Sequence, residues 1–295
     1  MATNSPPFPS PILPYHSKPY GAIDPSRAEL STKGKTVLIT GGGIGIGKAT
    51  ALAFAQAGAS HIGIIGRRAN VLDSTKQEIE SLYPNTKVHA LPGDLAKTES
   101  ITSAVTSFGE ALNGKIDILI ASAGYLHNFA TFADTDPADF WYTFEANVRG
   151  SFDLLKAFAP LAAKDAVVVN VSSAASYFPY LPNYMPYTSS KLAAVKVFDY
   201  FAVENPGLRM IHLQPGVVET EMGQKSAKAG VSFPFDDVNL PAHFTVWLAS
   251  PEAAFLDKRF VWANWDVDGL KAKEEEIKMD PLMFTVYLNG FPGLA

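Results

Sequence analysis

The sequence predicts an α/β protein built on a doubly wound parallel sheet with helices on both faces. Short apolar runs rich in Val and Ile alternate along the chain with longer helix-like stretches. Most of these runs are continuous rather than alternating, as expected for parallel strands that are covered on both faces. Strand–helix alternation at this spacing requires right-handed crossovers, which distribute the helices over both sides of one sheet.

The predicted elements follow one another from residue 36 onward. Strands are expected at 36–40, 61–65, 87–91, 116–121, 166–171, 208–213 and 259–262. Helices are expected at 46–58, 70–82, 98–112, 137–162 and 187–204. Residues 31–295 are therefore predicted to form a single domain, because no linker or internal repeat divides them.

The first 30 residues contain seven prolines and lack an apolar core segment. Neither a signal peptide nor a membrane span is expected there, because both need a continuous apolar stretch. Residues 1–30 are predicted to form an extended arm, flexible or lying along the surface, with a targeting or partner-binding role as the alternative. No other stretch is apolar enough to cross a bilayer, and we expect a soluble, cytoplasmic protein.

Composition and charge exclude several classes of function. The 295-residue chain carries a net charge of -5 and has no basic block, which argues against general binding to nucleic acid or to anionic membranes. It contains no cysteine, so disulfides, thiolate metal sites and a cysteine nucleophile are excluded. Histidines and carboxylates do not cluster in the sequence, and no metal site is expected.

The most informative motif is the glycine-rich turn at residues 40–47, which follows the first predicted strand and opens the first helix. In such a turn, free backbone N–H groups and the helix dipole meet a pyrophosphate, and glycine lets the backbone approach it closely. An ordinary tight turn is the alternative, but the flanking strand and helix favour nucleotide binding. The turn thus predicts a Rossmann-like fold, with cofactor contacts from Gly41, Gly43, Ile44, Gly45, Ile46 and Gly47.

The ends of the second and third strands indicate which dinucleotide binds. Gly66 occupies the place where an NAD site has an acidic residue for the ribose 2′-hydroxyl, and Arg67 and Arg68 follow it. Guanidinium groups suit a 2′-phosphate, so the pair favours NADP(H) over NAD(H), with ordinary surface arginines as the alternative. Beyond the third strand, Asp94 and Leu95 could reach the adenine, and Asp94 could equally cap a helix.

Tyr187 and Lys191 lie four residues apart at the start of a predicted helix, so their side chains share a face. An ammonium beside a phenol should lower its pKa from about 10 toward neutrality, as proton exchange with a carbonyl or alcohol requires. The same spacing recurs at 83–87, where a proline makes a helix unlikely. Only the copy at 187–191 follows an apolar strand, which ends in Ser173.

Together these motifs resemble the short-chain dehydrogenases/reductases over roughly residues 33–265, particularly the fungal secondary-metabolism members. The matched marks are, in chain order, the glycine turn, Asp94, Ala123, Gly124, Asn147, Ser173, Tyr187, Lys191, Pro215, Gly216 and Thr220. Two features depart from the family pattern. Ser122 replaces the usual Asn, which predicts a slightly altered loop, and residues 259–266 lack the Asp-Gly-Gly-like ending of many relatives.

The resemblance implies a role for each matched residue. Tyr187 would be the general acid in reduction and the base in oxidation, while Ser173 would hydrogen-bond the substrate oxygen. Lys191 would bind the nicotinamide ribose, and Asn147 would hold a water that links Lys191 to solvent. Cofactor contacts are further implied for Tyr187, Ala123, Gly124, Pro215, Gly216, Val218 and Thr220. The family also implies a homo-oligomer, dimer or tetramer, formed through the two longest helices.

Bulky apolar groups around the expected pocket suit a small hydrophobic carbonyl or alcohol, such as a polyketide or terpenoid. They are Tyr125, Leu126, His127, Phe129, Tyr177, Phe178, Tyr180 and Tyr184, with Met222, Phe233 and Phe235 in an expected lid at 217–237. Packing of the domain or of subunits explains half of them equally well. Two further functions stay open: an isomerase, dehydratase or cyclase with a structural nucleotide, and a non-catalytic scaffold.

Overall fold

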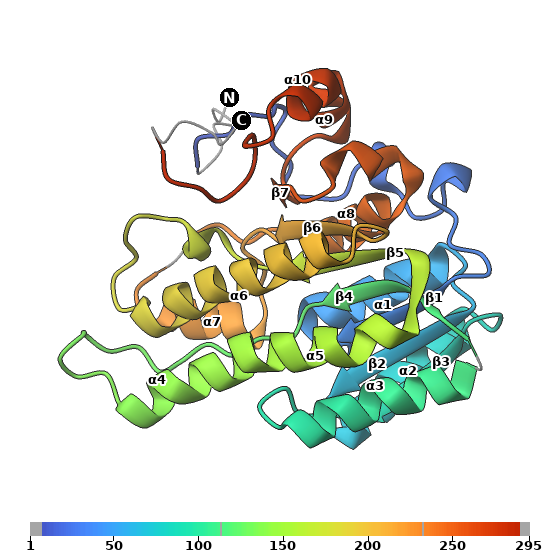
Figure 1. Ribbon diagram of the computed structural model, residues 1–295, viewed down its shortest axis with the longest axis horizontal. Helices are drawn as coiled ribbons and strands as arrows, with labels where there is room; N and C mark the ends of the chain where they lie inside the picture. Colours follow the sequence, from blue (N-terminus) through green and yellow to red (C-terminus); the bar gives the residue numbers. More distant parts are fainter. Residues whose placement is uncertain (1–7, 113, 232, 290–295) are drawn as a thin grey trace.

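A computed structural model describes residues 8–112, 114–231 and 233–289. Its centre is a parallel seven-stranded sheet in the order β3-β2-β1-β4-β5-β6-β7 (Figure 1). The strands are β1 (Thr36–Thr40), β2 (His61–Gly66), β3 (Lys87–Pro92), β4 (Ile116–Ala121), β5 (Ala162–Val171), β6 (Arg209–Gln214) and β7 (Phe260–Trp262). The strand order reverses between β1 and β4, so the adjoining loops diverge at the carboxyl ends of these strands.

Helices cover both faces of the sheet, as predicted. Those of the described residues are α1 (Gly45–Gln56), α2 (Ala69–Leu82), α3 (Thr98–Leu112), α4 (Pro137–Phe144), α5 (Gly150–Phe158), α6 (Met185–Glu204), α7 (Glu221–Lys228), α8 (Asn239–Ala249), α9 (Val267–Ala272) and α10 (Glu274–Met279). One core joins the sheet to α1, α2 and α8, and the other joins it to α3, α5 and α6. Val37 and Ile39 of β1 belong to the first core and Leu38 to the second, which explains the continuous apolar run.

The helix predicted at 137–162 is interrupted. A π-helical turn, η3 (Glu145–Arg149), separates α4 from α5, and β5 begins at Ala162 rather than at residue 166. Two helices after residue 220, α7 and α8, were not predicted. Helix α7 spans only eight residues, too few turns for a clear period of apolar residues.

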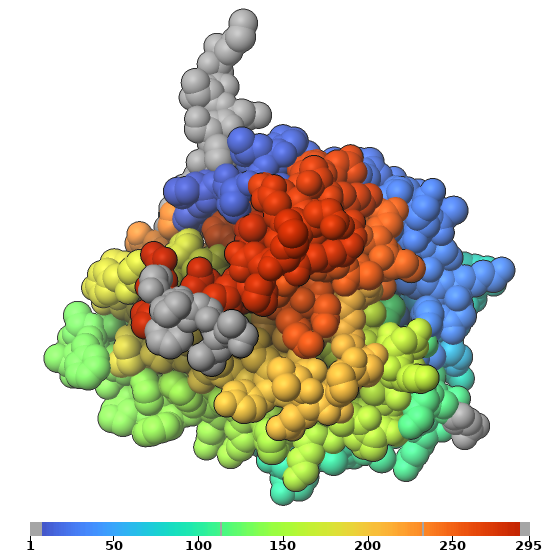
Figure 2. Space-filling model, turned by 45° about the horizontal axis from the view of Figure 1, so that its top comes forward, coloured from blue at the N-terminus to red at the C-terminus, as the bar shows by residue number. Residues whose placement is uncertain are grey.

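The described part of the proline-rich segment lies along the surface beside the C-terminal residues (Figure 2). It also contributes to the core, because Ile12, Ile23 and Leu30 are almost fully buried. The sequence does not indicate these core contacts, since single apolar residues between prolines form no periodic run. Tyr15 pairs with Trp265 in an antiparallel bridge. Residues 1–7 of the expected arm lie outside the described residues.

None of the helices in the described part of the chain combines the length and the apolar character that a bilayer crossing needs. The cytoplasmic location expected from the sequence stays a prediction.

Candidate cofactor and active site

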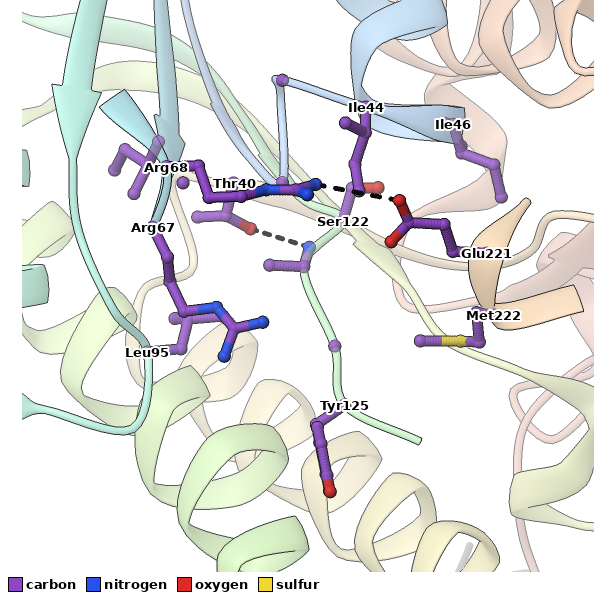
Figure 3. Close-up of a pocket in the computed structure, with 18 of the residues that line it drawn as sticks. Thr40, Ile44, Ile46, Arg67, Arg68, Leu95, Ser122, Tyr125, Glu221 and Met222 are labelled. Carbon is purple, nitrogen blue, oxygen red and sulfur yellow. Dashed lines mark hydrogen bonds and ion pairs between the residues drawn. The ribbon is translucent and has the colours of Figure 1, made fainter. Parts of the chain in front are cut away.

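A cavity of about 550 Å³ opens at the carboxyl ends of β1 to β4, beneath the start of α7 (Figure 3). Four loops that are distant in the sequence meet around it, each directly after a strand. Most of the predicted cofactor residues line this cavity: Gly41, Gly43, Ile44, Gly45, Ile46, Gly47, Arg67, Arg68, Asp94, Leu95, Ala123, Gly124 and Thr220. The sheet topology therefore brings together residues that the sequence had assigned to a single ligand.

The glycine turn forms the floor of the cavity. Ile44 is extended and precedes the first residue of α1, so the opening N–H groups of this helix have no partner within the helix. Gly47 packs directly on the backbone of the turn, and a Cβ there would overlap the carbonyl oxygen of Gly41. Any larger residue would therefore open the turn. This arrangement suits a pyrophosphate bound at the N-terminus of α1.

Two arginines reach into the cavity from the end of β2. Arg68 extends across it, and its Nη2 lies 4.0 Å from Oε1 of Glu221 on α7, whereas Arg67 projects beside Leu95 (Figure 3). Both partners of the Arg68–Glu221 pair are more than half exposed, so the pair is weak and an anionic ligand could readily displace it. Asp94 lines the cavity and also accepts a hydrogen bond from Ala96 N at 3.1 Å, which supports the turn before α3.

Ser173, Tyr187 and Lys191 come together beside the cavity. Ser173 precedes the short helix η5 (Ala174–Ser176), and its Oγ accepts a hydrogen bond from Ala175 N at 3.2 Å. Its own hydroxyl hydrogen remains available to donate. Tyr187 lies in the first turn of α6 and Lys191 one turn later, with Nζ 5.8 Å from the centre of the Tyr187 ring.

The pKa values of these groups differ from the sequence-based expectation. Burial raises the pKa of Tyr187 to about 12, opposed in part by a hydrogen bond with Ser173. Burial also lowers the pKa of Lys191 to about 8. Because both side chains are less than one-tenth exposed, their charged forms are poorly solvated, and Lys191 Nζ donates to Val171 O at 3.1 Å. The expectation that Lys191 draws the tyrosine pKa toward neutrality is wrong for the chain alone.

Asn147 lies in the π-helical turn and is almost fully buried. Its Oδ1 accepts from Tyr125 N at 2.7 Å, and its Nδ2 donates to Tyr125 O at 2.9 Å and to Ser190 Oγ at 3.0 Å. These bonds tie the loop after β4 to α6. A π-helical turn is a common device for placing a functional side chain inside a long helix. The water-holding role implied by the resemblance stays a prediction.

Comparison with known proteins settles the family. A family model described as short chain dehydrogenase matches residues 35–230. The chain belongs to the short-chain dehydrogenase/reductase family. A short chain dehydrogenase/reductase of Claviceps purpurea is 34% identical over 285 residues, 95% of each chain. The short chain dehydrogenase/reductase AacuD of Aspergillus aculeatus is 32% identical over 286 residues, 95% of this chain and 97% of its own.

A solved structure supports the same assignment. An alcohol dehydrogenase from the archaeon Thermococcus sibiricus, complexed with 5-hydroxy-NADP, matches with a TM-score of 0.65 and 26% sequence identity. The match covers 72% of this chain and 89% of that one. The predicted resemblance to the short-chain dehydrogenases/reductases, including fungal members, is thereby confirmed.

Some predicted residues of this dehydrogenase/reductase are not part of the cavity lining. They are Asn147, Ser173, Tyr187, Lys191, Pro215, Gly216 and Val218. Lys191 is nevertheless adjacent, because a Cβ at Gly124 would lie 3.5 Å from its Nζ. Thr220 precedes α7 and accepts from Gly223 N at 3.1 Å.

Other lining residues were not predicted to contact the cofactor, notably Thr40, Tyr142 and Ala146. Thr40 could have been found, because it ends β1 within the glycine motif. Its Oγ1 accepts from Ala123 N at 3.1 Å and so supports the backbone of the loop after β4 (Figure 3). Tyr142 and Ala146 belong to the interrupted helix and carry no sequence signal of their own.

Helix α7 closes over Tyr187. Lys225 Nζ donates to Leu126 O at 2.8 Å, and Ser226 Oγ contacts the Tyr184 hydroxyl. Beneath these contacts lies an apolar cluster of Leu126, Ala175, Tyr184 and Tyr187, against which Phe129, Leu181, Met222 and Val231 pack. Leu126, Phe129, Tyr184 and Met222 are thus among the predicted pocket residues that surround Tyr187. Ser232 of the expected lid lies outside the described residues.

Other predicted pocket residues have different surroundings. Phe178 packs against Phe8, with ring centres 5.7 Å apart, and Tyr177 accepts a hydrogen bond from Trp262 Nε1 at 2.6 Å. Tyr180 is largely exposed. His127 lies in the loop after β4 and is almost fully buried, with Nε2 2.8 Å from Asn183 O. Packing within the domain therefore accounts for several of the aromatic residues, which was the alternative interpretation.

Proposed function

We propose that this protein is an NADP(H)-dependent oxidoreductase that moves a hydride between nicotinamide and a carbonyl or secondary alcohol carbon, with Tyr187 exchanging the proton. One observation carries the proposal. Gly124 lines the cavity, and a Cβ added to it would lie 3.5 Å from both Lys191 Nζ and Asn147 Oδ1. The cavity is therefore adjacent to the Ser173–Tyr187–Lys191 set.

The cavity fits a dinucleotide at each of its parts. The open N–H groups at the start of α1 suit the pyrophosphate. Arg67 and Arg68 suit a 2′-phosphate, and NADP(H) is therefore preferred over NAD(H). The archaeal alcohol dehydrogenase of similar fold, which is complexed with 5-hydroxy-NADP, supports this preference. When bound, the cofactor supplies or accepts the hydride.

The side chains of the chain itself handle the proton and the developing charge. In reduction, the Tyr187 hydroxyl donates its proton to the substrate oxygen, and the Ser173 hydroxyl hydrogen-bonds the same oxygen. Because the pKa of Tyr187 is raised to about 12, the phenol stays protonated at neutral pH, as a general acid must. Lys191 would bind the nicotinamide ribose, and its charge would favour the phenolate that forms. Asn147 would hold the loop after β4 in register with α6.

The substrate class follows from the surroundings of Tyr187. The cluster around it is apolar, and α7 screens it from water, which supports a hydrophobic carbonyl or alcohol substrate. The resemblance of the sequence to fungal secondary-metabolism members favours a secondary metabolite within this class. Polar substrates such as sugars would leave their hydroxyls without partners in such a pocket.

A homo-oligomer is part of the proposal. Large apolar side chains that one subunit leaves exposed occur on α4, α5 and α6, namely Trp141, Phe152, Leu192, Tyr200 and Val203. Exposed apolar groups concentrated on neighbouring helices are typical of subunit contacts. Size-exclusion chromatography with light scattering should give a dimer or tetramer, and a monomer at micromolar concentration would contradict this part.

A panel of ketones and alcohols, read by NADPH absorbance with NADH in parallel, tests the function. We expect consumption of NADPH in proportion to the alcohol formed. Tyr187→Phe should lose turnover while NADPH still binds. Conversion of a substrate without net change in NADPH would indicate an isomerase, dehydratase or cyclase instead, and full activity of Tyr187→Phe would overturn the proposed mechanism.

A further inference from the structure

The loop after β6 is held by a buried carboxylate that lies outside the cavity. Asp236 is 8% exposed, and its Oδ2 accepts from Val217 N at 2.9 Å. Asp236 N donates in turn to Val217 O at 2.6 Å, and Asp236 forms a parallel bridge with Val218. One residue therefore engages both backbone groups of Val217 and sets the path of the chain toward Thr220.

The same carboxylate packs on the turn at Gly216. This residue has a φ of +89°, a left-handed conformation that favours glycine. A Cβ at Gly216 would lie 2.5 Å from Asp236 Oδ2 and 3.4 Å from Asn264 Oδ1. The turn and the carboxylate therefore fit each other directly, with no space for a side chain between them.

The far side of Asp236 faces the N-terminal segment. Asp237 N donates to Ser17 O at 2.9 Å. His16 and Asn264 exchange two hydrogen bonds, from His16 N to Asn264 O and from Asn264 Nδ2 to His16 O, both 2.8 Å long. Burial raises the pKa of Asp236, and hydrogen bonds from Val217, Asn264 and Ser17 oppose that rise. These contacts form one network from the N-terminal segment to the loop after β6.

We infer that Asp236 is a positioning residue for the nicotinamide end of the cofactor, and that residues 16–17 belong to the same hydrogen-bond network. The inference rests on the proposed function and on the family resemblance, which implies that residues 215–220 line the nicotinamide. Without the carboxylate, Val217 N–H loses its partner and the turn loses its packing surface. The family model matches from residue 35 onward, so the N-terminal segment adds a support that lies outside the matched part.

The test compares Asp236→Ala, Asp236→Asn and Asp153→Asn in the full chain. Asp153 is the matched control: it is 7% exposed and accepts from Thr98 Oγ1 at 2.7 Å, on the opposite face of the sheet. Asp236→Asn keeps an oxygen that can accept from Val217 N and serves as the conservative rescue. Thermal unfolding monitors the fold of each variant.

Hydrogen exchange of residues 215–220, measured without cofactor, reports how firmly this segment is held, independently of activity. We expect Asp236→Ala to speed exchange in this segment about tenfold or more, because the Val217 amide loses its acceptor. The NADPH dissociation constant should rise several-fold and kcat should fall about tenfold, since a misplaced nicotinamide reacts slowly. Asp236→Asn should keep most of the wild-type exchange protection, NADPH affinity and kcat. Asp153→Asn should leave the exchange of this segment, NADPH affinity and kcat near wild type.

Two outcomes would overturn the inference. The first is unchanged exchange at 215–220 in Asp236→Ala, and the second is an equal loss of NADPH affinity in Asp153→Asn, which would indicate general destabilisation. Failure of the proposed function looks different: wild type would then consume no NADPH with any carbonyl, while the exchange effect of Asp236→Ala would persist. Ser17→Ala should change hydrogen exchange and NADPH affinity in the same direction as Asp236→Ala, but by less. If neither changes, the N-terminal segment does not take part in the network.

Discussion

Asn147 holds the backbone of Tyr125 at both its N–H and its carbonyl, with hydrogen bonds of 2.7 and 2.9 Å. Its amide also donates to Ser190, one residue before Lys191. A buried amide that satisfies three partners joins the loop after β4, the π-helical turn and α6. The positions of Tyr187 and Lys191 relative to the cavity therefore depend on a residue that belongs to neither the cavity lining nor α6.

Asn147→Asp tests this connection. Aspartate keeps an acceptor for Tyr125 N but has no donor for Tyr125 O or Ser190 Oγ, so buried acceptors lose their partners. We expect a loss of about 1–3 kcal/mol in the free energy of unfolding and a fall in kcat of about tenfold or more. Asn205→Asp, which removes a donor to Phe201 O at the far end of α6, should leave kcat unchanged. Equal kcat in both variants would contradict the connection.

Replacing Arg67 and Arg68 together by alanine should convert cofactor preference. Without the guanidinium groups a 2′-phosphate has no cationic partner at the end of β2, so we expect KM for NADPH to rise by about tenfold or more. KM for NADH should change little. Lys87→Ala, which removes an exposed cation at the other end of the sheet, serves as the control. A wild-type enzyme that prefers NADH would overturn the assignment of these arginines.

The pH dependence of reduction should follow Lys191. Its pKa is lowered to about 8 by burial, so the ammonium is lost as the pH rises through this value. Tyr187, with a pKa raised to about 12, stays protonated over the same range. We expect kcat/KM for carbonyl reduction to be level near neutral pH and to fall above about pH 8. A profile that stays flat to about pH 10 would show that the Lys191 charge is not needed.

Glu252 should stabilise the fold in a pH-dependent way. Burial by itself would raise the pKa of Glu252, but hydrogen bonds from Lys271, Arg27 and Trp247 outweigh it and lower the pKa from 4.5 to about 2. A lowered pKa means that the stabilisation is complete above about pH 4.5 and is lost as the pH falls toward about 2. Glu252→Gln should therefore cost about 1–2 kcal/mol at neutral pH, after allowance for solvent screening.

Urea unfolding at about pH 7 and about pH 3 measures this effect. The difference between wild type and Glu252→Gln should shrink at the lower pH, because Glu252 of the unfolded chain is then protonated, which stabilises the unfolded state of the wild type. Glu204→Gln, an exposed carboxylate at the end of α6, should change stability little at either pH. A difference for Glu252→Gln that is independent of pH would mean that its charge does not stabilise the fold.

Lys225→Met should weaken the attachment of helix α7 over Tyr187. The variant loses the hydrogen bond to Leu126 O and the position of Nζ 5.7 Å above the Tyr125 ring, while the apolar stem is kept. We expect KM for the carbonyl substrate to rise several-fold with little change in KM for NADPH. Lys228→Met removes an exposed cation from the same helix and should have no effect on either. Equal effects of the two variants would argue against a specific contact.

Much of the fold and most of the cavity lining could be predicted from the sequence, for a physical reason. The glycine turn, Arg67 and Gly124 each follow a strand directly, and parallel strands bring such positions to one edge of the sheet. Strands buried on both faces also produce apolar runs that are easy to recognise. The role of Thr40 could be inferred in the same way, whereas Tyr142 could not, because its position depends on an interruption inside a helix that the pattern predicts as continuous.

The glycine turn and the order of the matched residues were enough to identify the family from the sequence, because both depend on local backbone chemistry. Tertiary structure alone decided the protonation of Tyr187, since burial depends on how α6 and α7 close around it. It also decided that Phe178 packs against Phe8 and that Asp236 contacts Ser17, both partners belonging to the N-terminal segment. Contacts between residues more than 150 positions apart carry no local pattern, and only the folded chain creates them.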